Sequence, residues 1–592
     1  MGGGRPGAAD EQGAKGHAIM NPATDRKRIL LAGVFGPYGV DDEYGRKENI
    51  MELFHNQVTK AQGVGSFRFF HRSFGLYFLA ANIDADVTVL DFPSKARFER
   101  EVKKGYDIVG ISFITPNFRK AARMAEMTRE LAPAAEIVIG GHGAAIEGVE
   151  DLVDCDHVVK GEGIRWLRAH LGQDPDAPIA HPILPSTEKQ YIMGMRVPGP
   201  SASILVPGVG CVNGCNFCCT SHFFGKRYTS FIDTGRQMFE TARTIAEARG
   251  SDAFFIMDEN FLKNRERAME LIEEMERHER FFRFHIFSSA EAITAFGLDN
   301  LVRLGVQMIW IGFESVSAQG FFAKNVGIDG AALVKELRDR GIIVLGSGIL
   351  CMEHHTPQNM QRDVDFLVDL EADMVQFMLY TPLPVTALYE DHKRRGLLRE
   401  DLPFEEWHGQ KHLAYRHPEF EGDEPEKWIR KAFRQDYEVN SSTMYRVLET
   451  TLRGYLHLLS KKDRDALLET RLAQFRDQLA EYSLLVDSII ANSVNDKERD
   501  RGMAIRERID STLGTPSLAT RAARTAARAL TAAWKVRTRL FGDIIQPATI
   551  VTRFADQEEM RKRLPMGTDS TGRKIPGVID LPPAAAAMVT AD

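Results

Sequence analysis

Three cysteines lie close together near the middle of the chain, in the stretch Gly210-Cys211-Val-Asn-Gly-Cys215-Asn-Phe-Cys218-Cys219. Their spacing is C-x3-C-x2-C, and an apolar run at residues 202–206 predicts a strand that ends just before this loop. Thiolates so spaced can bind three irons of a [4Fe–4S] cluster, because such clusters are held by cysteine sulfur. No fourth cysteine follows at a ferredoxin-like spacing, so one iron would stay open for a ligand. The alternatives are inert buried thiols or a zinc site, although zinc usually takes paired C-x2-C units with further ligands downstream.

The cysteine loop resembles the signature of the radical S-adenosylmethionine (SAM) enzymes, including the aromatic Phe217 just before the third cysteine. The resemblance implies that Cys211, Cys215 and Cys218 hold the cluster, and that SAM chelates the open iron through its amino and carboxylate groups. It also implies that one electron, from a donor such as flavodoxin or ferredoxin, cleaves SAM to methionine and a 5′-deoxyadenosyl radical. Cys219 lies outside the family pattern, and a packed small residue is the commoner role of a lone cysteine.

A series of strands and helices surrounds and follows the cysteine loop. We predict strands at residues 202–206, 253–257, 282–287, 307–312, 342–350 and 374–380, with helices such as 236–249, 264–278 and 330–340 between them. Six such βα units predict an incomplete parallel barrel, in which the C-terminal ends of the strands carry the chemistry. The pattern looks like the radical SAM partial barrel, over residues 200–400.

Several strand ends of this barrel carry candidate cofactor contacts. Asp258 and Glu259 follow the second strand, where a carboxylate could accept ribose hydroxyls or the SAM ammonium, or could instead cap the next segment. Glu314 and Ser315 match the G-x-E-S turn of related enzymes, and the resemblance implies that they contact SAM. Ser347, at the end of the fifth strand, is assigned to the same cofactor-binding set.

Two further features lie near the last strands. His354 and His355 could be metal ligands, but at a loop end before Thr356-Pro357 we expect them to be surface polar residues. The segment 381–386 resembles the P-x-P-G-T segment that follows the sixth strand in the family, with Val385 in place of the usual glycine.

Another βα series precedes the cysteine loop, over residues 27–172. We predict strands at 28–34, 86–91, 106–113, 136–140 and 156–160, and helices such as 66–83 and 118–131. Unbroken apolar strands alternating with helices predict a parallel, Rossmann-like sheet that binds ligands outside the carboxyl ends of its strands. Small residues there let a bulky planar or phosphorylated ligand approach the backbone. The candidate cofactor-binding residues at these ends are Gly36, Ser112, Gly140, Gly141, Gly161 and Glu162.

The order of these segments looks like the cobalamin-binding domain that precedes many radical SAM domains. The matching pieces are Gly-Ile-Ser at 110–112, Ile-Val-Ile-Gly-Gly-His at 137–142 and Lys-Gly-Glu-Gly at 160–163. The D-x-H-x-x-G motif, whose His ligates cobalt in many cobalamin proteins, is absent, and His142 lacks its spacing. We therefore expect cobalamin without a protein imidazole on cobalt. The alternative is a Rossmann-like domain that has lost its ligand.

The remaining segments are read from composition. Residues 1–26 are expected to be a disordered tail, the proline-rich stretch 173–199 an extended linker, 401–580 a mostly helical C-terminal domain, and 581–592 a second tail. Residues 501–563 carry thirteen Lys or Arg against six Asp or Glu, and a basic amphipathic helix between Pro516 and Pro547 could lie at a membrane surface. We favour the alternative, a helix packed on its own barrel with a solvated basic face. The basic residues on that face are Arg521, Arg524, Arg528, Lys535 and Arg539, with Leu530, Trp534 and Phe541 opposite.

Length and composition narrow the functional class. With 592 residues the chain is too long for one core, and its net charge of −7 gives no support for nucleic-acid binding. No apolar run is long enough to span a membrane, and the N-terminus lacks the pattern of a secretory signal. Six cysteines, three of them clustered, favour metal binding in a reducing cytoplasm over a disulfide framework.

Together these features predict a cobalamin-dependent radical SAM enzyme with an α/β fold. The resemblance implies a methyltransferase, in which a substrate radical at an unactivated carbon of a small molecule or lipid takes a methyl group from methylcobalamin. Two sheets whose C-terminal edges face one another would let both cofactors and the substrate meet. One alternative is the same architecture without methyl transfer, as in the anaerobic magnesium-porphyrin cyclase or the oxetanocin ring-contraction enzyme. The other is a metal-binding scaffold that has lost catalysis, which the intact cysteine triad argues against.

Overall fold

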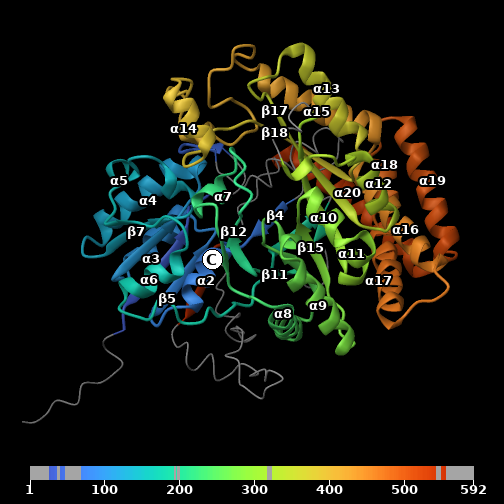
Figure 1. Cartoon of the computed structure of the whole chain (residues 1–592), viewed down its shortest axis with the longest axis horizontal. Helices are drawn as coiled ribbons and strands as arrows, with labels where there is room; N and C mark the ends of the chain where they lie inside the picture. The colour runs from blue at the N-terminus through green and yellow to red at the C-terminus, as the bar shows by residue number, and fades with distance from the viewer. Residues whose placement is uncertain are drawn as a thin grey trace, which may run out of the picture.

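Two parallel β-sheets stand side by side in the molecule, and a group of helices flanks the second sheet (Figure 1). The computed structural model describes residues 26–36, 41–46, 68–192, 195–196, 201–316, 323–541 and 548–554. The expected N-terminal and C-terminal tails, 1–26 and 581–592, fall almost wholly outside these residues.

The N-terminal sheet has the strand order β19-β5-β1-β6-β7-β8. Its parallel strands are β1 (Arg28–Gly33), β5 (Asp86–Asp91), β6 (Ile108–Ser112), β7 (Glu136–Gly140) and β8 (His157–Val158). Ile29 and Leu31 pack on one face with α2 (Phe74–Ala81) and α6 (Gly163–His170), while Leu30 and Ala32 pack on the other with α3 (Lys95–Val102) and α4 (Phe118–Leu131). Because the strands are buried on both faces, they read as unbroken apolar runs, and the predicted Rossmann-like sheet is confirmed.

Two predicted segments differ from the structure. The helix expected over 66–83 is β4 (Arg68–His71) followed by α2, which starts only at Phe74. The stretch 173–199 is not simply an extended linker, because it contains β9 (Thr187–Ile192) and β10 (Met195–Arg196), which form an antiparallel sheet with β4. The chain has no proline between Pro185 and Pro198, so the backbone N–H groups there are free to pair.

The second sheet is an incomplete barrel of six parallel strands in chain order, as predicted. The strands are β11 (Ser203–Leu205), β14 (Ala253–Ile256), β15 (Arg283–Phe287), β16 (Val306–Glu314), β17 (Ile343–Leu350) and β18 (Met374–Leu379). Its outer helices include α8 (Gly235–Arg249), α9 (Arg265–Arg277), α12 (Gly330–Asp339) and α13 (Pro357–Asp369). The last begins as the sequence predicts, with Thr356 as N-cap and Pro357 in the first turn.

The C-terminal region is helical and then returns to the N-terminal sheet. Helices α15 (Glu424–Asn440), α16 (Thr443–Ser460), α17 (Ala466–Ser483), α18 (Val486–Ala491), α19 (Asp496–Leu513) and α20 (Leu518–Phe541) follow the barrel. The chain then forms β19 (Ile550–Phe554), which pairs antiparallel with β5. The sequence-based domain 401–580 therefore includes an edge strand of the N-terminal sheet, where Arg553 Nη2 lies 2.9 Å from Glu101 Oε1.

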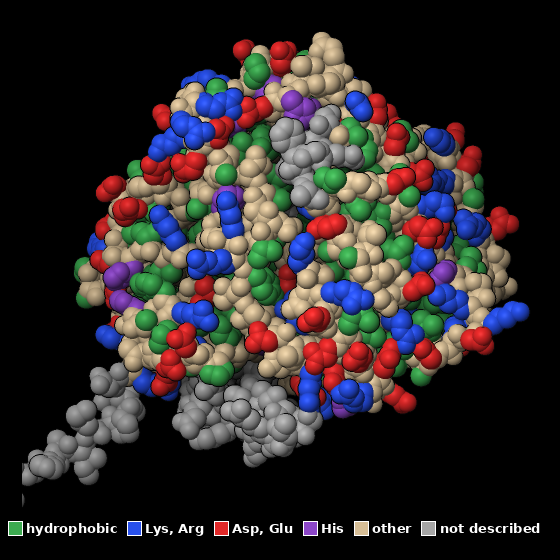
Figure 2. Space-filling model, viewed as in Figure 1, with side chains coloured by type: hydrophobic (Ala, Val, Ile, Leu, Met, Phe, Trp, Pro, Cys, Tyr) green, Lys and Arg blue, Asp and Glu red, His purple; other side chains and the backbone are tan. Residues whose placement is uncertain are grey.

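Two further observations concern the distribution of charge on the surface and the length and hydrophobicity of the helices. On the face shown in Figure 2, Lys or Arg and Asp or Glu side chains are interspersed rather than gathered into one basic surface. Of the helices that the structure describes, none is both long and apolar enough to cross a membrane.

Candidate active site

The cysteine loop joins two short antiparallel strands, β12 (Gly208–Gly210) and β13 (Tyr228–Ser230), and runs into α7 (Cys219–Phe223). The Ser221 hydroxyl donates to the Cys211 carbonyl oxygen at 2.6 Å and accepts the Gly214 N–H at 3.1 Å. The Cys218 N–H donates to the Cys215 carbonyl oxygen at 3.0 Å. The loop is therefore held both by Ser221 of α7 and by its own backbone, which keeps its three predicted ligands in one short segment.

The three thiols suit a polynuclear cluster better than a single ion. Burial raises the pKa of Cys211 and Cys215, and raises the pKa of Cys218 to about 12, so cluster binding must displace protons. Three groups of described side chains bring ligand atoms within 4.8 Å of one another, and the cysteine triad is not among them. A tetrahedral zinc would hold its sulfurs about 3.8 Å apart. At least one pair of these sulfurs is therefore more than 4.8 Å apart, which fits sulfurs that bind different corners of a cluster.

The loop lies where the two sheets meet. Helix α7 stands between them (Figure 1), and the ring of His142, just after β7, lies 4.7 Å from that of Phe223. Above this contact, α14 (Ala387–Arg394) reaches the N-terminal domain, where Lys393 Nζ lies 2.5 Å from Glu147. The C-terminal edge of the N-terminal sheet therefore faces the cysteine loop.

The candidate residues of the N-terminal sheet follow strand ends on one edge. Ser112 and Gly140 end β6 and β7, and Gly36 and Gly161 each lie three residues after the end of a strand. Gly36 donates its N–H to the Pro93 carbonyl oxygen at 3.1 Å. Gly141 has φ +80, and a Cβ there would lie 2.6 Å from the Phe113 carbonyl oxygen.

Glu162 accepts the N–H groups of Ile164 and Arg165 as the N-cap of α6. Gly141 and Glu162 therefore each have a role in the local structure that does not depend on a ligand. His142 is neutral, because burial lowers its pKa to about 4.

The two carboxylates after β14 have different surroundings. Asp258 is buried, with Arg267 Nη2 and the Tyr228 hydroxyl each 2.8 Å from Oδ2 and the Asn260 N–H 3.0 Å from Oδ1. It ties the strand end to α9 and β13, which favours the local structural role over the SAM contact.

Glu259 keeps an exposed surface, and its carboxylate lies close enough to the cysteine loop to raise the pKa of Cys211 and Cys218. Surrounding protein and Asp258 raise its pKa to about 7, against a hydrogen bond from Thr220. Glu259 is therefore the carboxylate available to a ligand.

Glu314 forms an ion pair that the sequence did not reveal. Its Oε1 lies 2.5 Å from Nζ of Lys324, and Asn325 holds the Lys324 segment to β16 by donating to the carbonyl oxygens of Gly312 and Phe313, each at 3.0 Å. Burial alone would lower the pKa of Lys324, but Glu314 and Cys215 raise it above its ordinary value. A Cβ on Gly312 would lie 2.3 Å from Glu314 Oε1. The pair thus brings a half-buried cation toward the cysteine loop.

Other candidates are placed as follows. Phe217 lies 6.3 Å from Tyr380, ring to ring, and Ser347 is half-buried in β17. Val385 has φ +74, so the turn after β18 keeps a left-handed conformation without the usual glycine.

His354 is exposed as expected, but His355 is fully buried, which contradicts the surface prediction. Its ring is paired with Asp363 of α13.

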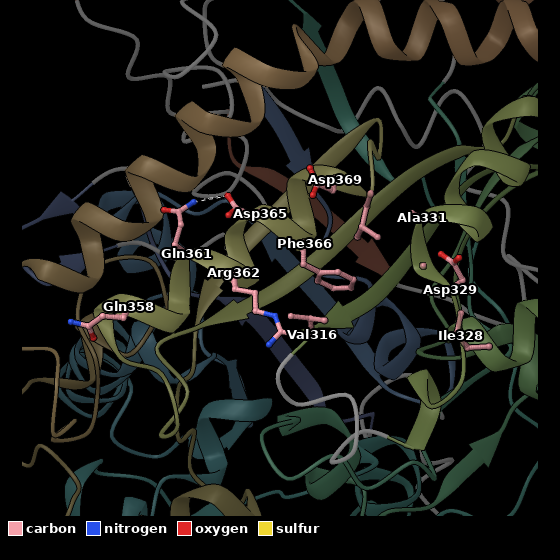
Figure 3. A pocket seen from close by; sticks show the side chains of 12 residues that line it. Val316, Ile328, Asp329, Ala331, Gln358, Gln361, Arg362, Asp365, Phe366 and Asp369 are labelled. Atoms are coloured by element: carbon pink, nitrogen blue, oxygen red, sulfur yellow. Dashed lines mark hydrogen bonds between the residues drawn. The ribbon is translucent and has the colours of Figure 1, made fainter.

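A hollow of about 650 Å³ lies away from the cysteine loop, between α12 and α13. Arg362 and Phe366 of α13 face Val316 across it (Figure 3). It opens on the helical side of the barrel, so we do not assign it to the cofactors.

Comparison with known proteins agrees with this geometry. The model of the Radical SAM superfamily matches residues 205–367, and that of the B12 binding domain matches residues 63–169. The chain contains a B12-binding domain followed by a radical SAM domain. Its cofactors are therefore a [4Fe–4S] cluster, SAM and cobalamin, as the sequence predicts. The individual contact residues, including the three cysteines of the motif, stay predictions.

Three similar proteins illustrate the relationship. Bacteriochlorophyllide d C-12(1)-methyltransferase of Chlorobaculum tepidum is 26% identical over 334 residues, which are 52% of this chain and 71% of that protein. The anaerobic magnesium-protoporphyrin IX monomethyl ester cyclase of Rubrivivax gelatinosus is 22% identical over 364 residues, 53% of this chain and 64% of that protein. The radical SAM methyltransferase TsrM of Kitasatospora setae, solved with cobalamin and a [4Fe-4S] cluster, aligns with 77% of this chain and 100% of its own at 15% identity and a TM-score of 0.47.

Proposed function

We propose that this protein is a cobalamin-dependent methyltransferase that transfers a methyl group from SAM to an unactivated carbon of a small-molecule or lipid substrate. The observation that carries the proposal is the contact of His142 with Phe223, because it brings the edge of the B12-binding sheet to the helix that follows the cysteine loop. The similarity to bacteriochlorophyllide methyltransferases supports methyl transfer over other radical chemistry.

The side chains at this interface have the chemistry that methyl transfer would need. When bound, the cluster and SAM supply a carbon-centred radical, and cobalamin supplies the methyl group. Cys211, Cys215 and Cys218 would hold the cluster, with Glu259 exposed beside them and the Glu314–Lys324 pair close to Cys215. The rings of His142, Phe223 and Phe224 would give an apolar wall that excludes water from a reactive radical.

Isotope transfer tests this function. Cells that express the protein and are fed methionine with a trideuterated methyl group should make a product that carries the whole CD3 group. A Cys215→Ala variant serves as control, since it should lack the radical chemistry and leave the substrate unlabelled. If the native protein forms deoxyadenosine and alters its substrate without CD3, methyl transfer is wrong. The cyclase or rearrangement alternative, which the similarity to the anaerobic cyclase keeps open, would then replace it.

We further infer that α20 docks on an anionic membrane surface, which would bring the active site to a lipid-soluble substrate. The helix spans 24 residues with six Lys or Arg and no Asp or Glu. Its packed face contains Arg524, Ala527 and Thr531 and lies against α18 rather than on the barrel; Arg524 pairs with Asp510 at 2.7 Å. From the sequence, we predicted that this helix packs on the barrel and exposes only a basic face to solvent.

The outward face of α20 is apolar. At about 100° per residue, Leu518, Val536 and Leu540 fall within about 40° of one another on a helical wheel. Their exposed fractions are 83%, 57% and 69%. Exposed arginines border this ridge, with Arg521, Arg528 and Arg539 on one side. An apolar ridge bordered by cations is the arrangement of interfacial helices, whose cations attract anionic lipid.

A further inference from the structure

Two neighbouring strands of the barrel end in strained backbone. Glu314, the last residue of β16, has φ +63, and Cys351, the residue after β17, has φ +55. Non-glycine residues in this region cost about 1–3 kcal/mol and persist only where their surroundings hold them. The two strands pair side by side, with a shift of register between Gly312 and Glu314. Such bulges re-aim side chains next to active sites.

The residues after both strained positions are hydrogen-bonded to one pair of buried side chains. After Glu314, the Ser315 hydroxyl donates to Asp363 at 3.0 Å and the Val316 N–H donates to Asp363 Oδ1 at 2.7 Å. After Cys351, the Met352 N–H donates to His355 Nδ1 at 2.9 Å, and His355 Nε2 bonds to Asp363 Oδ2. One chain of hydrogen bonds therefore joins the two strand ends.

The bonding pattern assigns the proton of the buried imidazole. Because His355 Nδ1 accepts the Met352 N–H, the ring proton is placed on Nε2, which donates to Asp363. Both side chains are fully buried. The same atoms form a cluster with His354 within 4.8 Å, but both His355 nitrogens are already engaged in hydrogen bonds, so we do not assign a metal here.

Asp363 lies on α13, a helix whose N-terminus is capped. α13 begins with a reciprocal cap in which Thr356 accepts the Asn359 N–H and Asn359 accepts the Thr356 N–H. His355 directly precedes this cap, so helix start and imidazole are fixed together. Figure 3 shows Val316 facing the outer hollow beside α13, while its N–H bonds to Asp363.

We propose that Asp363, oriented by His355, is a positioning residue that imposes the left-handed turn at Glu314 and so directs the Glu314–Lys324 pair toward the cysteine loop. The inference rests on the proposed function, in which the Glu314–Lys324 pair lies close to Cys215. Without the Asp363 carboxylate, the Ser315 hydroxyl and the Val316 N–H lose their hydrogen-bond acceptor. The backbone at Glu314 then relaxes toward ordinary, negative φ values. Lys324, held to Glu314 at 2.5 Å, then moves with it. Asp363 would thereby set the SAM site without touching SAM.

The test compares Asp363→Asn with Asp436→Asn. Asp436 is a buried carboxylate on α15, paired with Arg446 at 2.7 Å and outside the strand ends. In reconstituted protein without SAM, Asp363→Asn should speed amide hydrogen exchange at Val316 about tenfold, because the neutral amide removes the charge assistance and offers one acceptor oxygen where the carboxylate offers two. It should keep the iron content and raise the KM for SAM in deoxyadenosine formation. Asp436→Asn should lower thermal stability and change neither the exchange nor the KM.

A milder pair of variants protects the test against misfolding. Ser315→Ala removes only the hydroxyl and should raise the KM several-fold, and Ser315→Thr should restore it. Native exchange at Val316 in folded Asp363→Asn would overturn the inference, as would accelerated exchange with an unchanged KM. If the native protein never cleaves SAM, the proposed function fails on its own, while the exchange measurement still reports whether Asp363 holds the turn.

Discussion

His142 and Phe223 face each other ring to ring at 4.7 Å, joining the edge of the B12-binding sheet to the helix that follows the cysteine loop. Burial lowers the pKa of His142 to about 4, so the imidazole is neutral, and it is engaged in aromatic packing. At this point the two domains meet through an aromatic contact, and the ion pair of Lys393 with Glu147 also joins them.

The first prediction follows from this packing. Bound cobalamin should carry no protein nitrogen on cobalt, since His142 packs against α7 and lacks the D-x-H-x-x-G spacing. The Co(II) resonance should show no nitrogen splitting from the protein, in native protein and in His142→Ala alike. Splitting present in the native protein and lost in His142→Ala would identify His142 as a cobalt ligand.

Iron content tests the ligand assignment in the cysteine loop. Cys211→Ala, Cys215→Ala and Cys218→Ala should each abolish the reconstituted [4Fe–4S] cluster, because three sulfurs are the minimum set at this spacing. Cys219→Ala should retain it, since Cys219 is the first residue of α7 and lies outside the motif. The assignment is wrong if Cys219→Ala loses the cluster while Cys218→Ala keeps it.

The edge strand β19 should contribute to stability through the pair of Arg553 and Glu101. Burial alone would raise the pKa of Glu101, but hydrogen bonds from Tyr106, Lys104 and Arg553 outweigh it and hold that pKa below its ordinary value. A carboxyl with a lowered folded-state pKa stabilises the fold above its unfolded pKa of about 4.3, and this stability is lost as the pH falls through the folded pKa. Arg553→Ala should therefore cost about 2 kcal/mol in urea unfolding at pH 7, and less near pH 3.

The control for this pair is Arg129→Ala. Arg129 pairs with Asp154 and Asp156, whose side chains are 54% and 39% exposed whereas Glu101 is 1% exposed, so its loss should cost under about 1 kcal/mol. Equal losses of unfolding free energy in Arg553→Ala and Arg129→Ala would show that the burial of Glu101 adds nothing to the stability that its ion pair provides.

Local patterns explain which features the sequence could predict. The cysteine motif is contiguous, and the apolar runs of both sheets persist because their strands are buried, so cluster ligands and strands were readable. Lys324 and Asp363 were not, because their partners Glu314 and Ser315 come from other segments and only the fold brings them together. The return of β19 to β5 spans more than 450 residues and has no sequence signal of its own. His355 was predicted to lie at the surface because it stands at a loop end before Thr356-Pro357, and the sequence does not show that Asp363 pairs with it in the interior.

The membrane role of α20 is best tested by substitution. Deleting the chain after Pro516 would also remove β19 and with it an edge of the N-terminal sheet, so truncation confounds binding with folding. Replacing Arg521, Arg528 and Arg539 by Gln leaves β19 intact. Each cation near an anionic surface is worth about 1 kcal/mol, so binding to phosphatidylserine vesicles should fall about a hundredfold.

Two comparisons make this last prediction specific. Gln at Arg165, Arg394 and Arg430, three arginines at least half exposed elsewhere, changes the net charge equally and should leave vesicle binding unchanged. Val536→Ser with Leu540→Ser should weaken binding at all salt concentrations, because the apolar contact is not screened, whereas the loss from the arginine variant should shrink as salt rises. Equal binding by the native protein and both α20 variants would reject the membrane contact and leave α20 as a helix that packs on α18.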